Sequence, residues 1–222
     1  MEILDLTHLQ TDPPKAYHKF RRVNEKGRVL RSNQPGGAVV KRNPANVTGI
    51  TIHQCAVSFG ASKALLKEAG GDIDKARHLR ALGVACHVLA FDCGHVVHSA
   101  PFDWYVYHGN GLNAYQLGLE IEGRYNGLWK DDQVTNDTLE AACAALKYMV
   151  EEGRKLGMPI EWIYAHRQSS ATRRGDPGAE LWTRCVLLYA VPILGLKTDP
   201  GFTVGGGRPV PLEWDANGKG NY

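Results

Sequence analysis

The sequence lacks any apolar run that approaches roughly 18 residues, the length that a membrane-spanning helix needs. Its beginning, MEILDLTHLQTDPPK, has neither the basic start nor the apolar stretch of a secretory signal, so we expect synthesis in the cytoplasm without a signal peptide. The five cysteines are odd in number and include no Cys-x-x-Cys pair, which argues against a disulfide framework or a thiolate zinc site. An excess of one charge is also missing, because 26 basic and 23 acidic residues leave a net charge of +3. We therefore expect no nucleic-acid partner and no membrane insertion.

What is present is ordinary for a globular protein, with 43% apolar and 22% charged residues in a chain of 222. Residues 1–46 are polar and rich in proline and glycine, which indicates an irregular N-terminal arm with at most a short strand pair around Gly27 and Arg28. Residues 47–196 carry the regular apolar patterns of one domain. From residue 197 to residue 222 the chain contains the run Gly205-Gly206-Gly207 and three prolines between Pro200 and Pro211, which is typical of a tail or linker.

Short β-branched segments alternate with amphipathic ones along the central domain, and this alternation predicts an α/β fold. Within residues 116–122, Leu117, Leu119 and Ile121 alternate with Gly118 and Glu120, as in a strand whose two faces differ. The predicted strands are residues 47–53, 84–91, 95–98, 116–122 and 162–166, and the predicted helices are residues 61–69, 72–82, 137–156 and 179–194.

Two of the nine histidines, His53 and His166, each end a predicted buried strand, where side chains meet loops and solvent. A catalytic zinc needs three protein ligands and one open position. Asp176 follows His166 by ten residues and is a candidate third ligand. Alternatively, Asp176 caps the last helix, with Pro177 as its first residue. The residue types alone favour the cap and leave the metal site as the second interpretation.

Several motifs in a fixed order resemble the zinc-dependent N-acetylmuramoyl-L-alanine amidases of the type 2 family. That family includes phage amidase lysins, cytosolic amidases that recycle anhydro-muropeptides, and peptidoglycan recognition proteins. The resemblance spans about residues 47–190. It rests on Thr-Gly-Ile-Thr-Ile-His (48–53), Gly-Leu-Glu-Ile-Glu-Gly (118–123), Tyr-Ala-His-Arg (164–167) and Arg-Gly-Asp-Pro-Gly (174–178).

The resemblance implies a single α/β domain with a central mixed sheet flanked by helices. It implies one Zn²⁺ held by His53, His166 and Asp176, and it matches Glu120 to the catalytic glutamate of the recycling amidases. Arg174 stands where the family commonly has lysine, and we expect its charge to stabilise the oxyanion.

Two further positions of the family pattern bear on the site. By the same resemblance we expect His108 and Asn113 in the substrate cleft, and a structural role in their loop is the alternative. Cys86 occupies a position where phage members often have a catalytic tyrosine, and a thiol does not replace a phenol in reach or acidity. This difference shifts the expected catalytic role to Glu120 and leaves Cys86 as a buried structural thiol.

The sequence therefore predicts a peptidoglycan hydrolase that cleaves the amide bond between N-acetylmuramic acid and L-alanine with zinc-activated water. We expect a phage-type lysin that acts on the cell wall as a monomer. The alternatives are a non-catalytic peptidoglycan-binding module and a cytosolic anhydro-muropeptide recycling amidase. We expect the tail to lie against the domain surface away from the zinc, with Trp214 as its anchor, and to be dispensable for catalysis.

Overall fold

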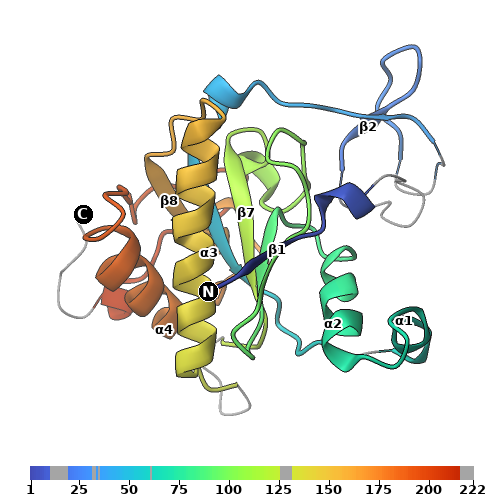
Figure 1. Cartoon of the computed structure of the whole chain (residues 1–222). Coiled ribbons are helices and arrows are strands. Elements are labelled where there is room, and N and C mark those ends of the chain that lie inside the picture. The colour runs from blue at the N-terminus through green and yellow to red at the C-terminus, as the bar shows by residue number, and fades with distance from the viewer. Residues whose placement is uncertain (11–19, 32–33, 35, 61, 126–131, 216–222) are drawn as a thin grey trace.

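The structure, a computed structural model, describes residues 1–10, 20–31, 34, 36–60, 62–125 and 132–215 (Figure 1). Its central sheet contains six strands, which are β1 (Ile3–Asp5), β4 (Gly49–Gln54), β5 (Val88–Ala90), β6 (Val96–His98), β7 (Gln116–Ile121) and β8 (Trp162–Ala165). The order across the sheet is β1-β6-β5-β7-β4-β8. Strands β5 and β6 pair antiparallel, and all other neighbours pair in parallel. The predicted mixed sheet of an α/β domain is therefore confirmed.

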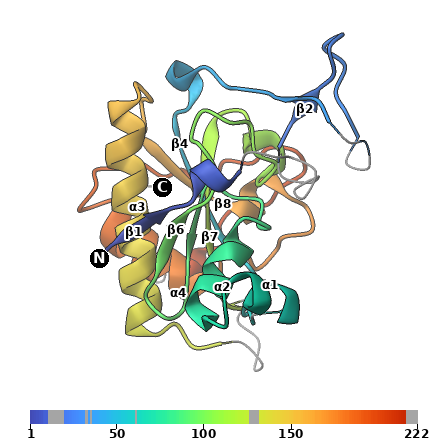
Figure 2. The ribbon, with the colours of Figure 1, turned by 45° about the vertical axis from the view of Figure 1, so that its right-hand side comes forward.

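Helices cover both faces of this sheet. They are α1 (Lys63–Glu68), α2 (Ile73–Ala81), α3 (Asn136–Lys155) and α4 (Ala179–Leu181), and α4 continues as the π-helical segment η6 (Trp182–Ala190). Asp72 caps α2 by accepting from the Lys75 amide, and Thr135 caps α3 by accepting from the Thr138 amide. Figure 2 shows α3 along one side of the sheet and α1 and α2 on the other.

The alternation of residues along the strands separates the main core from the site. On β7, Leu117 and Leu119 are fully buried in the core that α3 completes, as the pattern predicted. Glu120, the next residue, faces the opposite side of the sheet. On β4, Ile52 belongs to the same core and His53 lies on the side of Glu120. His53 and Glu120 therefore lie on the face of the sheet that α3 does not cover.

The first 46 residues were expected to form an irregular arm with at most one short strand pair, and the described part of them contains three short strands. Strand β1 joins the edge of the central sheet, where it pairs in parallel with β6. Strands β2 (Arg22–Val23) and β3 (Ala38–Val39) form a separate antiparallel pair. Ile3 and Leu4 are apolar and pack onto the domain, which explains why the chain begins in the sheet.

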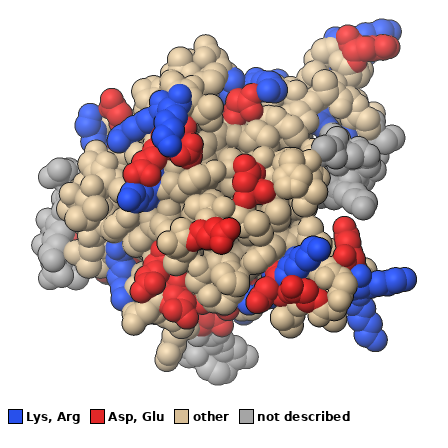
Figure 3. All heavy atoms as spheres, viewed as in Figure 1, with Lys and Arg blue, Asp and Glu red and all other residues tan. Residues whose placement is uncertain are grey.

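The tail closes the opposite edge of the sheet. Lys197 forms a parallel bridge with Trp162 of β8, and its carbonyl accepts from the amide of Ile163 at 2.9 Å. Among the described residues no helix combines the length and apolar character needed to cross a membrane. Charges of both signs are interspersed on the face shown in Figure 3, and α3 carries the pairs Lys147–Glu151 and Lys155–Glu152.

Candidate metal centre

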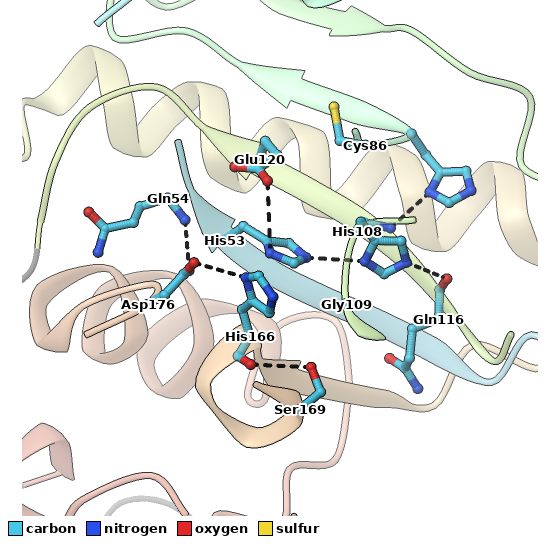
Figure 4. Close-up of polar contacts among 12 residues, drawn as sticks. His53, Gln54, Cys86, His108, Gly109, Gln116, Glu120, His166, Ser169 and Asp176 are labelled. Atoms are coloured by element: carbon cyan, nitrogen blue, oxygen red, sulfur yellow. Dashed lines mark hydrogen bonds and ion pairs between the residues drawn. The ribbon is translucent and has the colours of Figure 1, made fainter. Parts of the chain in front are cut away.

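Three buried side chains from separate segments converge at the carboxyl end of the parallel strands (Figure 4). His53 lies on β4, His166 follows β8, and Asp176 lies in the loop before α4. Because β4 and β8 pair in parallel with Ile52 opposite Ala165, the two histidines that follow lie side by side, with ring centroids 4.3 Å apart. One potential ligand atom from each of the three residues lies within 4.8 Å of the other two. The structure thus brings together the three residues that the sequence predicted as ligands.

Asp176 turns towards the histidines and does not cap the last helix. Its Oδ1 accepts from the backbone amide of Gln54 at 3.0 Å, and its Oδ2 lies 2.9 Å from Nδ1 of His166. The N-cap of α4 is Gly178, and no side chain of the described residues caps that helix. Gln54 also donates from Nε2 to the carbonyl of Gly175, which ties this loop to β4. The interpretation of Asp176 as a helix cap is therefore wrong.

The chemistry of these donors fits a zinc ion. Two imidazoles and one carboxylate are ligands that zinc accepts, and three protein ligands leave one position open. Nδ1 of His53 is buried and has no hydrogen-bond partner among the described residues. A buried lone pair of this kind is expected where a cation binds. Burial, with a smaller contribution from the charge of His166, holds the pKa of His53 well below its usual range, so its ring is neutral and able to bind a metal.

Glu120 stands beside His53 on the neighbouring strand. The two residues are direct partners in the parallel pairing of β7 with β4, and Glu120 Oε1 lies 3.8 Å from His53 Nδ1. The Glu120 side chain is only 14% exposed. Burial and, to a smaller extent, the negative charge of Asp176 raise its pKa to about 8. A carboxyl group with a pKa near neutrality is suited to accept and return a proton.

His108 lies next to His53, and Asn113 contacts the backbone of His108. His108 Nδ1 is 3.2 Å from Nε2 of His53, and His108 Nε2 is 3.0 Å from the carbonyl oxygen of Gln116. Burial and the charge of Arg42 lower the pKa of His108 to about 3. Asn113 Oδ1 accepts from the amides of His108 and Gly109 at 2.9 and 2.6 Å. Their predicted role in a substrate cleft stays a prediction.

Two neighbouring arginines lie in the loop that precedes Asp176, and both are exposed. The positive charge of Arg173 lowers the pKa of His53 and of Glu120, so this guanidinium acts on both groups. The backbone carbonyl of Arg174 accepts from Nη1 of Arg167 at 2.5 Å. The sequence selected Arg174 as the cationic group, and the structure adds Arg173 as a second candidate.

Sequence reasoning did not identify Arg42, a buried cation behind the site. Its guanidinium donates to the carbonyl oxygens of Asn113, Gln116 and Phe102 at 2.9, 2.6 and 2.6 Å. No sequence signal marks it, because it precedes Asn43 and Pro44 in a segment typical of a loop. Cys86 is fully buried, with Sγ 3.6 Å from Ser99 Oγ, as expected for a structural thiol.

The tail lies closer to the candidate metal centre than the sequence predicted. It runs along the 3-10 turn η5 (His166–Ser169), which begins with a candidate ligand. Gln168 Nε2 donates to the carbonyls of Asp199 and Phe202 at 2.8 and 3.0 Å, and the amide of Arg208 donates to the carbonyl of Arg167 at 2.8 Å.

Trp214, the expected anchor of the tail, also contacts this turn. The guanidinium carbon of Arg167 lies 4.9 Å from the centroid of the Trp214 ring, and Thr183 Oγ1 donates to the Trp214 carbonyl at 2.7 Å. The tail therefore packs on the domain, but it does so against residues that directly follow His166.

Comparisons with solved structures find similar folds. N-acetylmuramoyl-L-alanine amidase LysC from Clostridium intestinale URNW is 15% identical at a TM-score of 0.50, over 89% of this chain and 99% of LysC. The endolysin amidase LysCS from Clostridium intestinale URNW gives the same identity and TM-score over 88% of this chain and 97% of LysCS. Drosophila PGRP-LB is 13% identical at a TM-score of 0.49, over 88% of this chain and 96% of PGRP-LB. At these identities the likeness to LysC and LysCS supports the fold alone.

The sequence itself provides the family assignment. A comparison with curated proteins gives no match. A family model described as N-acetylmuramoyl-L-alanine amidase matches residues 43–179, which is more than half of the 222 residues. All three candidate ligands, together with Glu120, fall inside the matched residues. The chain belongs to the N-acetylmuramoyl-L-alanine amidase family.

Proposed function

We propose that this chain is a zinc-dependent amidase that hydrolyses the bond between the lactyl group of N-acetylmuramic acid and L-alanine in peptidoglycan. The observation that carries the proposal is the group of His53, His166 and Asp176, three buried residues with potential ligand atoms within 4.8 Å of one another. The family match supports the choice of reaction, because it covers the segment that contains this group.

His53, His166 and Asp176 are the residues that would hold the zinc. When bound, the ion supplies a Lewis acid that lowers the pKa of water and polarises a carbonyl oxygen. The chain's own contribution is to present two imidazoles and one carboxylate from three fixed segments. The carboxylate is held by the Gln54 amide, so its position does not depend on the ion.

Glu120 is the proposed general base. It accepts the proton of the attacking water while the water oxygen bonds to the carbonyl carbon. The same carboxyl group then gives this proton to the amide nitrogen as the bond between carbon and nitrogen breaks, so that L-alanine leaves with a free amino group. Its position beside His53 and its low exposure support this role.

A cation is needed where the negative charge develops on the carbonyl oxygen. Arg174 is the residue that the family pattern selects, and Arg173 is the alternative that its charge on His53 and Glu120 favours. His108 and Asn113 were predicted in the cleft, and in this proposal they line its inner wall, since His108 is buried next to His53 and the buried Asn113 accepts from the His108 amide.

The proposed setting is a phage-type lysin, which is synthesised in the cytoplasm and acts on the cell wall. It is supported by the arm and the tail, since residues before 43 and after 179 lie outside the family match and exceed what a minimal recycling enzyme needs. A recycling enzyme would prefer free anhydro-muropeptides to the intact wall. A binding module would bind the wall without cleaving it.

The test is mass spectrometry of the products from purified sacculi and from isolated anhydro-muropeptides, with the full chain before and after treatment with a chelator. We expect free stem peptides from sacculi, loss of this release on chelation, and recovery when zinc is added back. Release from the soluble fragments alone would identify a recycling amidase. Wall binding that survives chelation and releases no new amino termini would overturn the enzymatic proposal.

A further inference from the structure

We infer that His108 is a positioning residue that fixes the tautomer of His53, so that Nδ1 of His53 carries the lone pair offered to the metal. The inference rests on the proposed metal centre and adds to it a residue that selects which nitrogen of His53 binds. It follows from the direction of two consecutive hydrogen bonds.

The first hydrogen bond determines the state of His108. Its Nε2 lies 3.0 Å from the carbonyl oxygen of Gln116, and a carbonyl oxygen only accepts. Nε2 of His108 therefore carries the hydrogen. In a neutral imidazole the other nitrogen then has a free lone pair, and Nδ1 of His108 presents this lone pair to His53.

The second hydrogen bond determines which nitrogen of His53 carries the hydrogen. Nε2 of His53 lies 3.2 Å from Nδ1 of His108, and it has to donate because Nδ1 only accepts. The hydrogen of the neutral His53 ring is thus held on Nε2. Nδ1 of His53 is left without a hydrogen, fully buried and without a hydrogen-bond partner among the described residues. It is also the nitrogen that faces Glu120, at 3.8 Å (Figure 4).

The surroundings of His108 hold the ring in this orientation. A Cβ atom added at Gly118 would lie only 2.6 Å from Cγ of His108, so the imidazole occupies the space that this glycine leaves open. Asn113 Oδ1 accepts from the His108 amide at 2.9 Å and fixes the backbone. Nη1 of Arg42 donates to the Gln116 carbonyl at 2.6 Å and so holds in place the oxygen that accepts from His108 Nε2.

A matched set of variants separates this role from general packing. His108→Leu removes the acceptor and keeps an apolar side chain in the space. His108→Asn keeps an oxygen near the position of Nδ1, so it should restore the acceptor. Gly118→Ala displaces the ring without changing His108. Gly109→Ala is the control, because its added Cβ would meet its neighbours at 3.6 to 3.7 Å, which is ordinary contact.

The first measurement is ¹⁵N NMR of the imidazoles in the metal-free chain at one fixed pH, with His53→Gln used to assign the signals of His53. We expect His53 of the wild type to carry its hydrogen on Nε2, and His108→Leu to give a mixture of both tautomers. Circular dichroism checks that each variant is folded. A wild-type His53 with its hydrogen on Nδ1 overturns the inference, whatever its zinc affinity.

The second measurement is zinc affinity by competition with a coloured chelator. Loss of a residue that orients a metal-binding histidine costs roughly 10- to 100-fold in affinity, and we expect this loss in His108→Leu and Gly118→Ala. His108→Asn and Gly109→Ala should stay within about threefold of the wild type, since the acceptor and the ring are kept. If the wild type binds zinc and folded His108→Leu binds it equally well, this inference fails while the proposed function stands. If the wild type binds no zinc, both fail.

Discussion

Glu120 Oε1 lies 3.8 Å from Nδ1 of His53, and the two residues are direct partners across the parallel strands β7 and β4. Parallel pairing fixes this relationship through the backbone, so neither side chain needs a flexible loop to reach the other. The proposed general base and a proposed metal ligand therefore belong to one rigid element. A site built on strands holds such a geometry more closely than one built on loops.

Glu120→Gln is expected to slow hydrolysis by roughly 10²- to 10⁴-fold, the usual contribution of a positioned general base. Glutamine keeps the size of the side chain but does not accept the proton of water. Zinc content, measured by elemental analysis, should stay at one ion per chain. Turnover near that of the wild type would show that another group is the base.

Asp176→Asn is expected to release the metal while the loop stays in place. The amide oxygen of asparagine still accepts from the Gln54 amide, but the negative charge beside His166 is lost. Zinc stoichiometry should fall well below one per chain, and the rise in melting temperature on adding zinc should disappear. Full zinc binding by this variant would remove Asp176 from the ligand set.

Arg173→Ala is expected to slow the reaction more than Arg174→Ala, because the charge of Arg173 acts on both His53 and Glu120. The loss should be about tenfold to a hundredfold in kcat, below that for a buried oxyanion donor because both arginines are exposed. Arg173→Lys should retain more activity than Arg173→Ala. A slow Arg174→Ala beside an unaffected Arg173→Ala would favour the residue that the family pattern selects.

The contribution of Glu120 to the stability of the metal-free chain should fall as the pH rises from about 5 to 8. The pKa of Glu120 is about 8 in the folded protein against an ordinary value of 4.5, so between these values the folded state holds a proton that the unfolded chain releases. One such proton gives a slope of up to about 1.4 kcal/mol per pH unit. The stabilisation is complete below pH 4.5 and is lost as the pH approaches 8. The buried His53 and His108, whose pKa values are lowered from 6.5, add a slope of opposite sign to both chains below pH 6.5. In urea unfolding with chelator present, the difference in stability between the wild type and Glu120→Gln should therefore show the slope of Glu120. Parallel profiles for the two chains would contradict the assignment.

Gly207→Ala tests the contact of the tail with the turn that carries His166. A Cβ atom at this position would overlap with the backbone of Gln168, so the tail has to move away from the turn. We expect a loss of about 1–3 kcal/mol in stability, as for other overpacked positions, together with weaker zinc binding. Gly201→Ala is the control, because its added Cβ would meet only Asp199 Oδ1 at 3.5 Å. Unchanged zinc affinity in a destabilised Gly207→Ala would agree with a tail that is dispensable for catalysis.

Local patterns predicted the elements that carry the site. The β-branched segment that ends in His53 and the short apolar segment before His166 form strands, and the alternation around Leu119 separates the core from Glu120. The prediction was possible because period-two patterning depends on burial of one face. The role of Asp176 could not be read from the residue types, because aspartate before proline is typical of a helix cap and favoured that interpretation over a metal ligand.

The remaining features depend on pairing between distant segments. The register that places Glu120 opposite His53 cannot be read from either strand alone. The contact between His108 and His53 requires the space at Gly118 on a third segment. Arg42 and the tail act through backbone carbonyls, which every residue possesses, so no residue type in the sequence marks their targets.

The bridge between Lys197 and Trp162 has a consequence for solubility. It occupies backbone groups at the outer edge of β8, the last strand of the sheet. An uncovered strand edge presents unpaired amides and carbonyls that pair with other molecules. A chain cut before residue 197 would expose this edge next to Trp162 and the fully buried Ile163. Shortened versions of this protein are therefore expected to aggregate through β8, and charged or proline substitutions on that strand edge would be needed to keep them in solution.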